Sequence, residues 1–269
     1  MQKERVNLTI DIDMNECYYN ELFNEEQLND VDIILLYGSA SSGKSFYMFD
    51  QHIPLKMEEG NRNFLCVRKV AKTLNDSVYN EIKKGLNEYG LIDRYTSINK
   101  TEKRFINKNG KEIKLIGLDD PEKIKSITPE NGVWTDIVIE EGTELAIDDF
   151  KQLLKRQRGH AKVKKHIYIL FNPTIQDHWI YKNYFEKYWE DKRYDDESYH
   201  IQKQNIDGMN VIIMRTTYKD NNFLDDEDIR KLESETDPYY FDVYSKGKWG
   251  SIRGVIFREG IHWYIDDLS

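Results

Sequence analysis

The chain has 269 residues, of which 39% are hydrophobic and 32% are charged, and its formal net charge is −9. This length suits one large domain, with or without a small appendage. The acidic balance argues against general adhesion to nucleic acid but leaves room for a local basic groove. Two cysteines cannot form a disulfide framework, and no apolar stretch reaches the roughly 20 residues that span a bilayer. We therefore expect a globular protein of a reducing compartment.

Strand and helix patterns alternate in the first part of the chain. Residues 31–38 form a continuous apolar run, typical of a strand buried on both faces, and residues 43–58 predict a helix. Residues 63–69 predict a second strand. A further helix is expected through about residue 89, with its cap at Thr73.

The rest of the chain continues this alternation after an antiparallel interruption. Residues 95–118 predict a hairpin, because Asn109-Gly110 separates two alternating runs. The later elements are strands at 134–141, 165–173 and 210–218, a helix at about 147–158, and two helical stretches after the last strand. Repeated strand–helix units predict an α/β fold with a mostly parallel central sheet flanked by helices, to which the hairpin is an antiparallel annex.

A phosphate-binding loop is predicted between the first strand and the first helix. The stretch YGSASSGKSF contains the pattern G-x-x-x-x-G-K-[ST] as Gly38, Gly43, Lys44 and Ser45. Unpaired N–H groups and the helix dipole favour phosphate at such a junction. Lys44 is expected to reach the β and γ phosphates of ATP, and Ser45 to bind Mg²⁺. The other nucleotide-binding residues expected here are Ser39, Ala40, Ser41, Ser42 and Phe46.

Two acids follow the apolar strand in WTDIVIEE. Successive strand residues point to opposite faces, so Glu140 and Glu141 are expected to have different tasks. We assign Glu140 to the Mg²⁺ shell, and Glu141 to polarising the attacking water. The alternative is that both simply end a buried strand where the chain meets solvent. Together with the loop upstream, the pair favours an ATP-hydrolysing P-loop NTPase.

Seven motifs occur in order along the chain: GSASSGKS, CVRK, GLDDPEKIKS, IVIEEGTEL, LFNPT, TTYKDNNFL and GKWG. Their series resembles the N-terminal ATPase half of the large terminase subunit of tailed bacteriophages, over about residues 30–258. The resemblance implies a P-loop NTPase fold in which an extra strand separates the two nucleotide-binding strands, and a glutamate as catalytic base. It also implies ATP hydrolysis coupled to translocation of double-stranded viral DNA into a procapsid.

Two further site residues take a role from this resemblance. Asn172 lies where terminases have a coupling motif, so its amide is expected to contact the γ-phosphate or the lytic water, with a strand-end Asn-Pro turn as the alternative. Arg68 ends the second predicted strand and is expected to contact phosphate or a neighbouring element, with an exposed salt bridge as the alternative.

The phosphate loop departs from the family pattern at Ala40, because many terminases have an arginine inside this loop. The missing charge is expected from a neighbouring subunit, and Lys125 is the candidate for this catalytic cation. Its competitors are Lys123, Arg68, Arg104, Arg156 and Arg158. The basic stretch KRQRGHAKVKKH, residues 155–166, could follow a DNA backbone, but a helix end that favours cations explains it at least as well.

The partners implied are double-stranded viral DNA, the portal protein and procapsid, the small terminase subunit, and further copies in a homo-oligomeric ring, in the host cell cytoplasm; the chain in isolation is expected to be monomeric. We expect an N-terminal extension packed on the core at 1–30, the ATPase domain at 31–258, and a tail or linker start at 259–269. Complete large terminases continue into a nuclease, and none is expected in this chain. The alternative functions are a phosphotransferase acting on a small substrate, such as a kinase, and a non-catalytic nucleotide-binding assembly module.

Overall fold

The computed structural model describes residues 10–23, 25–70, 77–118, 127–188 and 199–250. The strands within these ranges are β1 (Ile33–Gly38), β2 (Phe64–Arg68), β3 (Tyr95–Asn99), β4 (Arg104–Asn107), β5 (Glu112–Gly117), β6 (Asp136–Ile139), β7 (His166–Phe171), β8 (His200–Ile206) and β9 (Met209–Thr216).

The helical elements before β6 are α1 (Glu16–Tyr18), η1 (Tyr19–Phe23), η2 (Glu25–Gln27), η3 (Phe46–His52), α2 (Ile53–Glu58), α4 (Val78–Glu88) and η4 (Ile92–Arg94). Those after it are η5 (Gly142–Glu144), α6 (Ile147–Leu154), η6 (Tyr181–Phe185), η7 (Tyr218–Asp220), α7 (Asp226–Glu233), α8 (Pro238–Tyr240) and η8 (Phe241–Ser245). The η3 and α2 segments follow one another without a break, as the predicted helix at 43–58 requires.

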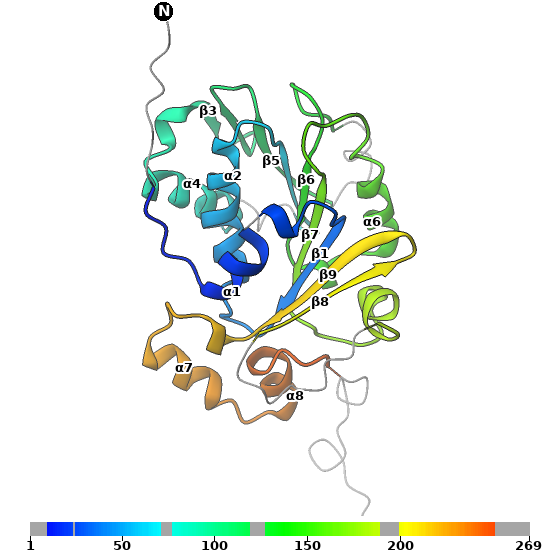
Figure 1. Cartoon of the computed structure of the whole chain (residues 1–269). Coiled ribbons are helices and arrows are strands. Elements are labelled where there is room, and N and C mark those ends of the chain that lie inside the picture. Colours follow the sequence, from blue (N-terminus) through cyan, green and yellow to red (C-terminus); the bar gives the residue numbers. More distant parts are fainter. Residues whose placement is uncertain (1–9, 24, 71–76, 119–126, 189–198, 251–269) are drawn as a thin grey trace, which may run out of the picture.

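The described strands form one nine-stranded sheet in the order β3-β4-β5-β2-β6-β7-β1-β9-β8 (Figure 1). The strands from β5 to β9 in this order pair in parallel, and antiparallel pairs lie only at the two edges. The predicted α/β fold with a mostly parallel sheet is therefore confirmed. The hairpin around Asn109-Gly110 is present as β4 and β5, and β3 extends it.

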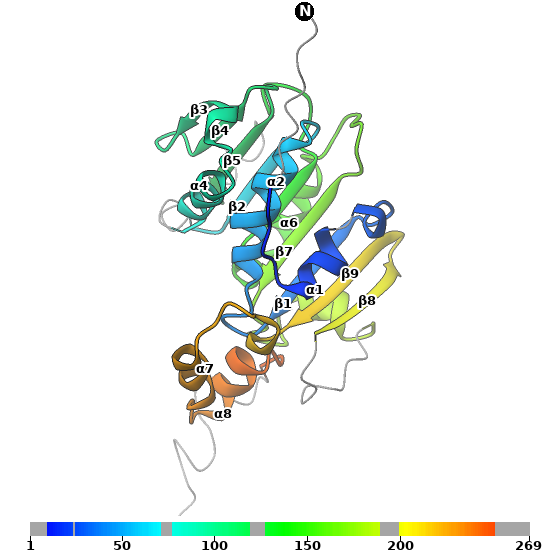
Figure 2. The ribbon, with the colours of Figure 1, turned by 60° about the vertical axis from the view of Figure 1, so that its left-hand side comes forward.

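Helices cover both faces of the sheet, so each face has its own core. Figures 1 and 2 show α1, α2 and α4 on one side and α6 on the other. Along β1, Ile34 and Leu36 pack toward the first group, while Ile33, Leu35 and Tyr37 pack toward the second. This two-sided burial explains why the strand appears in the sequence as a continuous apolar run.

The strand β7 lies between β1 and β6, as the resemblance implied. Ile167 of β7 is in register with Ile33 of β1 and with Ile137 of β6. The carboxyl ends of the three strands therefore meet at one edge of the sheet, where the loop after β1 and the acids after β6 come together.

Several predicted boundaries were wrong. The strand predicted at 134–141 is β6 at Asp136–Ile139, so Glu140 and Glu141 both lie beyond it. The helix predicted at 147–158 ends at Leu154, after which Gln157 turns its side-chain amide to the backbone carbonyls of Thr135 and His166. Strand β8 was not predicted.

Two predictions on segments cannot be compared with the structure. The cap at Thr73 lies outside the described residues, and so does the tail at 259–269. The domain boundaries at 30 and 258 stay predictions.

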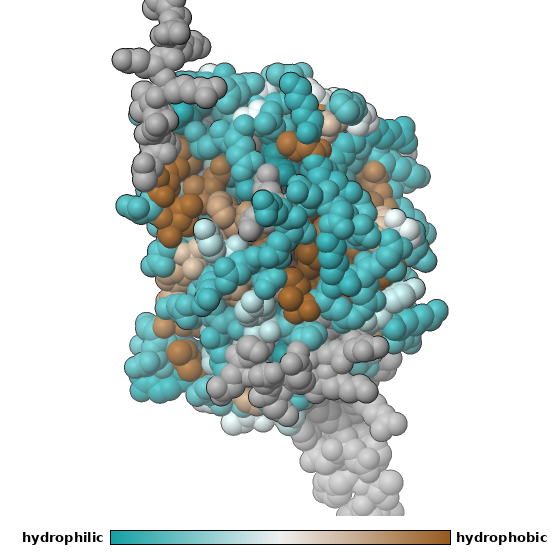
Figure 3. Space-filling model, in the orientation of Figure 1, coloured by the Kyte–Doolittle hydropathy of each residue, from teal (hydrophilic) through white to brown (hydrophobic). Residues whose placement is uncertain are grey.

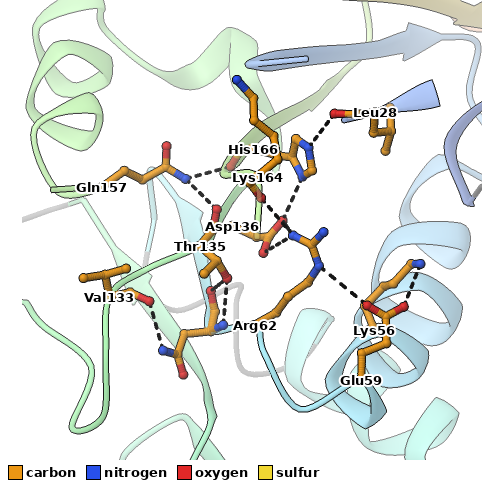
Figure 4. Close-up of polar contacts among 11 residues, drawn as sticks. Leu28, Lys56, Glu59, Arg62, Val133, Thr135, Asp136, Gln157, Lys164 and His166 are labelled. Carbon is orange, nitrogen blue, oxygen red and sulfur yellow. Dashed lines mark hydrogen bonds and ion pairs between the residues drawn. The ribbon is translucent and has the colours of Figure 1, made fainter. Parts of the chain in front are cut away.

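A buried ionic cluster links the amino ends of the central strands (Figure 4). Asp136 at the start of β6 is fully buried, and both of its carboxylate oxygens lie 3.1 Å from Nη1 of Arg62. Nδ1 of His166 on β7 lies 3.4 Å from Oδ1 of the same carboxylate, and its Nε2 lies 3.1 Å from the carbonyl oxygen of Leu28. Burial alone would raise the pKa of Asp136, but the hydrogen bond to His166 and the charge of Arg62 hold it below its usual value. The carboxylate thus fixes the relative positions of β6, β7 and the turn before β2.

None of the described helices is long and apolar enough to cross a membrane. The face drawn in Figure 3 is mostly hydrophilic, and its apolar residues form small separate patches.

The cluster yields a stability prediction. Asp136→Asn should lower the free energy of unfolding by about 3–5 kcal/mol at pH 7, because it leaves the buried Arg62 without its counter-charge. The deficit should shrink as the pH falls below 3.8, the usual pKa of the side chain, where wild type also loses the charge. Urea denaturation measures both effects.

The matched control is Asp148→Asn, which removes a carboxylate paired with Lys151 at 4.0 Å on the exposed side of α6. Asp148→Asn should lower the free energy of unfolding by less than about 1 kcal/mol, since exposed ion pairs contribute little to stability. Equal costs at the two positions would contradict the role given to Asp136.

Candidate nucleotide-binding site

A cavity of about 410 Å³ opens at the edge where β1, β6 and β7 end. The phosphate loop, the acids after β6 and the end of β7 surround it. Its lining residues are Ala40, Ser41, Ser42, Gly43, Lys44, Ser45, Phe46, Glu140, Glu141, Leu170, Phe171, Asn172, Asn221 and Leu224. The structure therefore brings together most of the residues that the sequence predicted.

The loop presents free hydrogen-bond donors. Among the described residues, the backbone N–H groups from Ser41 to Ser45 have no hydrogen-bond partner. The buried Lys44 ammonium donates to the carbonyl of Ser39 at 2.7 Å and to Oγ of Ser42 at 3.0 Å. Burial lowers the pKa of Lys44 to about 8, and the charge of Glu141 opposes this shift. Free N–H groups beside a lysine at a helix N-terminus suit a phosphate chain.

Close backbone packing determines the shape of the loop's first turn. A Cβ added at Gly38 would lie 1.7 Å from the carbonyl oxygen of Thr216, so β9 leaves no room for a side chain. Gly247 also packs closely here, because a Cβ added to it would lie 2.9 Å from Cα of Gly38. Ser39 donates its N–H to Thr216, and Ala40 donates its own to Tyr244. Gly38 and Ser39, predicted as nucleotide contacts, do not line the cavity and support the loop from behind.

Glu140 and Glu141 differ in backbone and in environment. Glu141 has a left-handed backbone, with φ 54°, and is half-buried. Glu140 is buried, and its Oε2 lies 3.3 Å from Nη1 of Arg68. Burial raises the pKa of Glu140 to about 7, while Arg68 opposes the shift and the charge of Glu141 adds to it. Strand alternation was the wrong reason to separate the two acids, because a turn and a difference in burial separate them instead.

Arg68 lies beside the cavity rather than in its lining. In addition to Glu140, its Nε lies 3.7 Å from Oε2 of Glu144, a residue that sequence reasoning missed. Arg68 therefore holds the Glu140 carboxylate, and its contact with phosphate stays a prediction. The alternative of a salt bridge is therefore present in partly exposed form, since the side chains of Arg68 and Glu144 are 18% and 43% exposed.

Asn172 connects the end of β7 with the phosphate loop. Its Nδ2 donates to the carbonyl of Gly38 at 2.7 Å, and the residue also lines the cavity. A movement of the loop backbone at Gly38 would therefore be transmitted to the end of β7 through this hydrogen bond. The predicted contact of this amide with phosphate or water is not tested.

The structure leaves the source of the missing cation open. Lys123 and Lys125 lie outside the described residues. Arg104 on β4 pairs with Glu112, and its Nη1 lies 2.7 Å from Oε1 of Glu130. Lys125 stays a prediction.

No group of three or more His, Cys, Asp or Glu side chains in the described part of the chain is arranged to hold a metal. Mg²⁺ bound with a nucleotide takes most of its ligands from phosphates and water, so Ser45 and Glu140 fit that mode.

A sequence model of the phage terminase large subunit matches residues 30–248, which is most of the chain. The chain belongs to this family. The PBSX phage terminase large subunit of Bacillus subtilis (strain 168) is 29% identical over 246 residues, which cover 90% of this chain and 54% of that protein.

Solved large terminases share the fold. The large terminase of a thermophilic bacteriophage, solved in complex with ADP, matches with a TM-score of 0.61 and 20% identity over 82% of this chain and 49% of its own. The large terminase ATPase domain of Thermus phage P74-26 matches with a TM-score of 0.56 and 9% sequence identity. The match covers 83% of this chain and 91% of the chain of that domain. The chain thus spans about half the length of the Bacillus subtilis protein and of the ADP-bound terminase.

The left-handed backbone at Glu141 yields a second prediction. Glu141→Gly should be more stable than Glu141→Ala by about 1 kcal/mol, because only glycine adopts this conformation without strain. The free energies of unfolding of the two variants measure the difference, and their common loss of the carboxylate cancels.

Lys151 in α6 is the control position, where alanine should be the more stable residue by about 1 kcal/mol. If alanine is also the better residue at position 141, the backbone there is not left-handed in solution.

Proposed function

We propose that this chain is the ATPase motor domain of a DNA-packaging terminase. It binds ATP with Mg²⁺ in the cavity at the phosphate loop and hydrolyses it to drive double-stranded viral DNA into a procapsid. The observation that carries the proposal is the meeting of free loop N–H groups, Lys44 and the Glu140–Glu141 pair around one cavity. Family membership and the solved complex of a thermophilic phage terminase with ADP support a nucleotide as the occupant.

Each group has a role that its position supports. The loop N–H groups and Lys44 bind the phosphates, and Ser45 with Glu140 takes the Mg²⁺. The bound metal would supply charge neutralisation of the phosphates. Arg68 fixes the Glu140 carboxylate, so that Glu140 is held while Glu141 is free to turn toward a water. Glu141 is accordingly proposed as the base that orients and polarises the attacking water.

The coupling of hydrolysis to movement is proposed to run through Asn172, because its amide already contacts the loop backbone at Gly38. Lys125 of a neighbouring copy is proposed to supply the missing transition-state charge in a homo-oligomeric ring. The proposed partners are the DNA, the portal protein with its procapsid, and the small terminase subunit, in the host cell cytoplasm. Residues 31–258 are proposed as the ATPase domain, packed against an extension at 1–30.

The two glutamates separate binding from chemistry, which yields a third prediction. Glu141→Gln should hydrolyse ATP about 10²–10⁴-fold more slowly, with little change in the dissociation constant for ATP–Mg²⁺, because it loses only the polarising carboxylate. Glu140→Gln should instead need a higher Mg²⁺ concentration for half-maximal turnover. Phosphate release at a series of Mg²⁺ concentrations measures both.

Glu144→Gln is the control, because it also removes a carboxylate near Arg68 but outside the cavity lining. It should retain most of the turnover. Normal turnover by Glu141→Gln together with an inactive Glu140→Gln would show that the two roles are reversed. No hydrolysis by wild type, even with portal, procapsid and DNA present, would overturn the proposed function.

A further inference from the structure

We propose that three side chains outside the phosphate-loop motif, Asn15, Tyr18 and Asn221, form a clamp that holds the carbonyl groups of the phosphate loop and aims its N–H groups at the nucleotide. Asn15 and Tyr18 come before the first strand and Asn221 comes after the last, so the clamp joins distant parts of the chain. The inference rests on the proposed function, because it concerns how the loop binds nucleotide phosphates.

Tyr18 contacts the loop from within the core. Its side chain is fully buried, and its ring stacks on that of Tyr47 with centroids 4.7 Å apart. Its hydroxyl donates to the carbonyl of Ser42 at 2.7 Å and lies 3.0 Å from Oγ1 of Thr216. One hydroxyl therefore links the loop to the end of β9. Tyr18 does not line the cavity, so it acts on a ligand only through the loop.

Asn221 anchors the neighbouring peptide group. Its Nδ2 donates to the carbonyl of Ser41 at 2.8 Å. Its Oδ1 accepts from Nδ2 of Asn15 at 3.1 Å, which fixes the orientation of the amide. The Oδ1 of Asn15 in turn accepts the N–H of Asn222 at 2.9 Å. Asn15 is buried, so it holds Asn221 in place without touching the loop carbonyl itself.

The geometry of the peptide bond means that anchoring a carbonyl group also sets the direction of the N–H group in the same peptide. In a trans peptide, the N–H points opposite to the carbonyl of the same peptide group. Fixing the carbonyls of Ser41 and Ser42 on the clamp side therefore points the N–H groups of Ser42 and Gly43 away from the clamp. Both residues line the cavity, and neither N–H has a hydrogen-bond partner among the described residues.

The clamp also supports an unfavourable backbone. Ser41 has φ 55°, a left-handed conformation that a residue with a side chain adopts only when its surroundings require it. When hydrogen-bond donors already point at the ligand site, binding does not have to order the loop, and the entropy lost on binding is smaller. Losing the anchor at Tyr18 or Asn15 should therefore weaken phosphate binding without removing a contact with the nucleotide, because neither residue lines the cavity. Asn15 and Tyr18 are positioning residues in this sense, whereas Asn221 both anchors the loop and lines the cavity.

The test compares Tyr18→Phe with Tyr47→Phe. Each removes one buried hydroxyl from the same stacked ring pair, but the hydroxyl of Tyr47 bonds Nδ1 of His52 at 2.9 Å rather than the loop. Tyr18→Phe should raise the dissociation constant for ADP–Mg²⁺ about three- to tenfold, the effect of one hydrogen bond. Tyr47→Phe should change it by less than about twofold, although both variants lose comparable thermal stability. Isothermal titration calorimetry with ADP measures the affinity.

Equal dissociation constants for the two variants would overturn the clamp, since a purely structural hydroxyl would affect both alike. A wild-type chain that binds no ADP would instead overturn the proposed function, so the two failures are distinct.

A second pair decides the question if Tyr18→Phe does not fold. Asn15→Asp keeps the acceptor for Asn222 but loses the donor to Asn221, and Asn205→Asp removes an exposed amide-to-amide bond, to Asn210, far from the loop. Asn15→Asp should raise the dissociation constant about two- to fivefold and speed amide hydrogen exchange at residues 41–43, while Asn205→Asp should do neither. An unchanged affinity for Asn15→Asp would overturn the clamp.

Discussion

The parallel register of β1, β7 and β6 is the constraint on which the candidate site depends. It brings the carboxyl ends of the three strands to one edge, so the phosphate loop, Asn172 and the two glutamates meet there although they are distant in sequence. The register is fixed at the opposite ends of the strands, where Asp136 binds Arg62 and His166. The buried carboxylate of Asp136, paired at one edge of the sheet, thus helps to position the unpaired N–H groups of the phosphate loop at the other edge.

Backbone groups carry much of this site. The first turn of the loop is buried against β9 and Gly247, and its carbonyls accept hydrogen bonds from Asn172, Asn221 and Tyr18. Tyr18 holds its carbonyl from within the core, whereas Asn172 and Asn221 also line the cavity. The N–H groups that remain free are those that line the cavity, which is the arrangement expected of a site for an anionic ligand.

The sequence allowed the fold and the loop to be predicted because both have local signals. Alternation of apolar runs indicated the parallel strands, and the spacing of Gly43, Lys44 and Ser45 indicated the loop. Strand β8 was missed because it is a half-buried edge strand whose residues, HIQKQNI, are mostly polar. The left-handed turn at Glu141 and the contacts of Tyr18 and Asn221 with the loop depend on tertiary packing. Glu141 and Asn221 lie in the motifs IVIEEGTEL and TTYKDNNFL, but neither motif indicates the turn or the contact with the loop.

The central claim is that the free N–H groups of the loop bind the phosphates of a nucleotide. Amide hydrogen exchange of the wild-type chain, with and without saturating ADP and Mg²⁺, tests it most directly. We predict strong protection of the amides from Ser41 to Ser45 on addition of ADP, and no change in residues 155–165 at the far end of β7. Saturable binding of ADP that leaves the amides of residues 41–45 exchanging as before would contradict the claim.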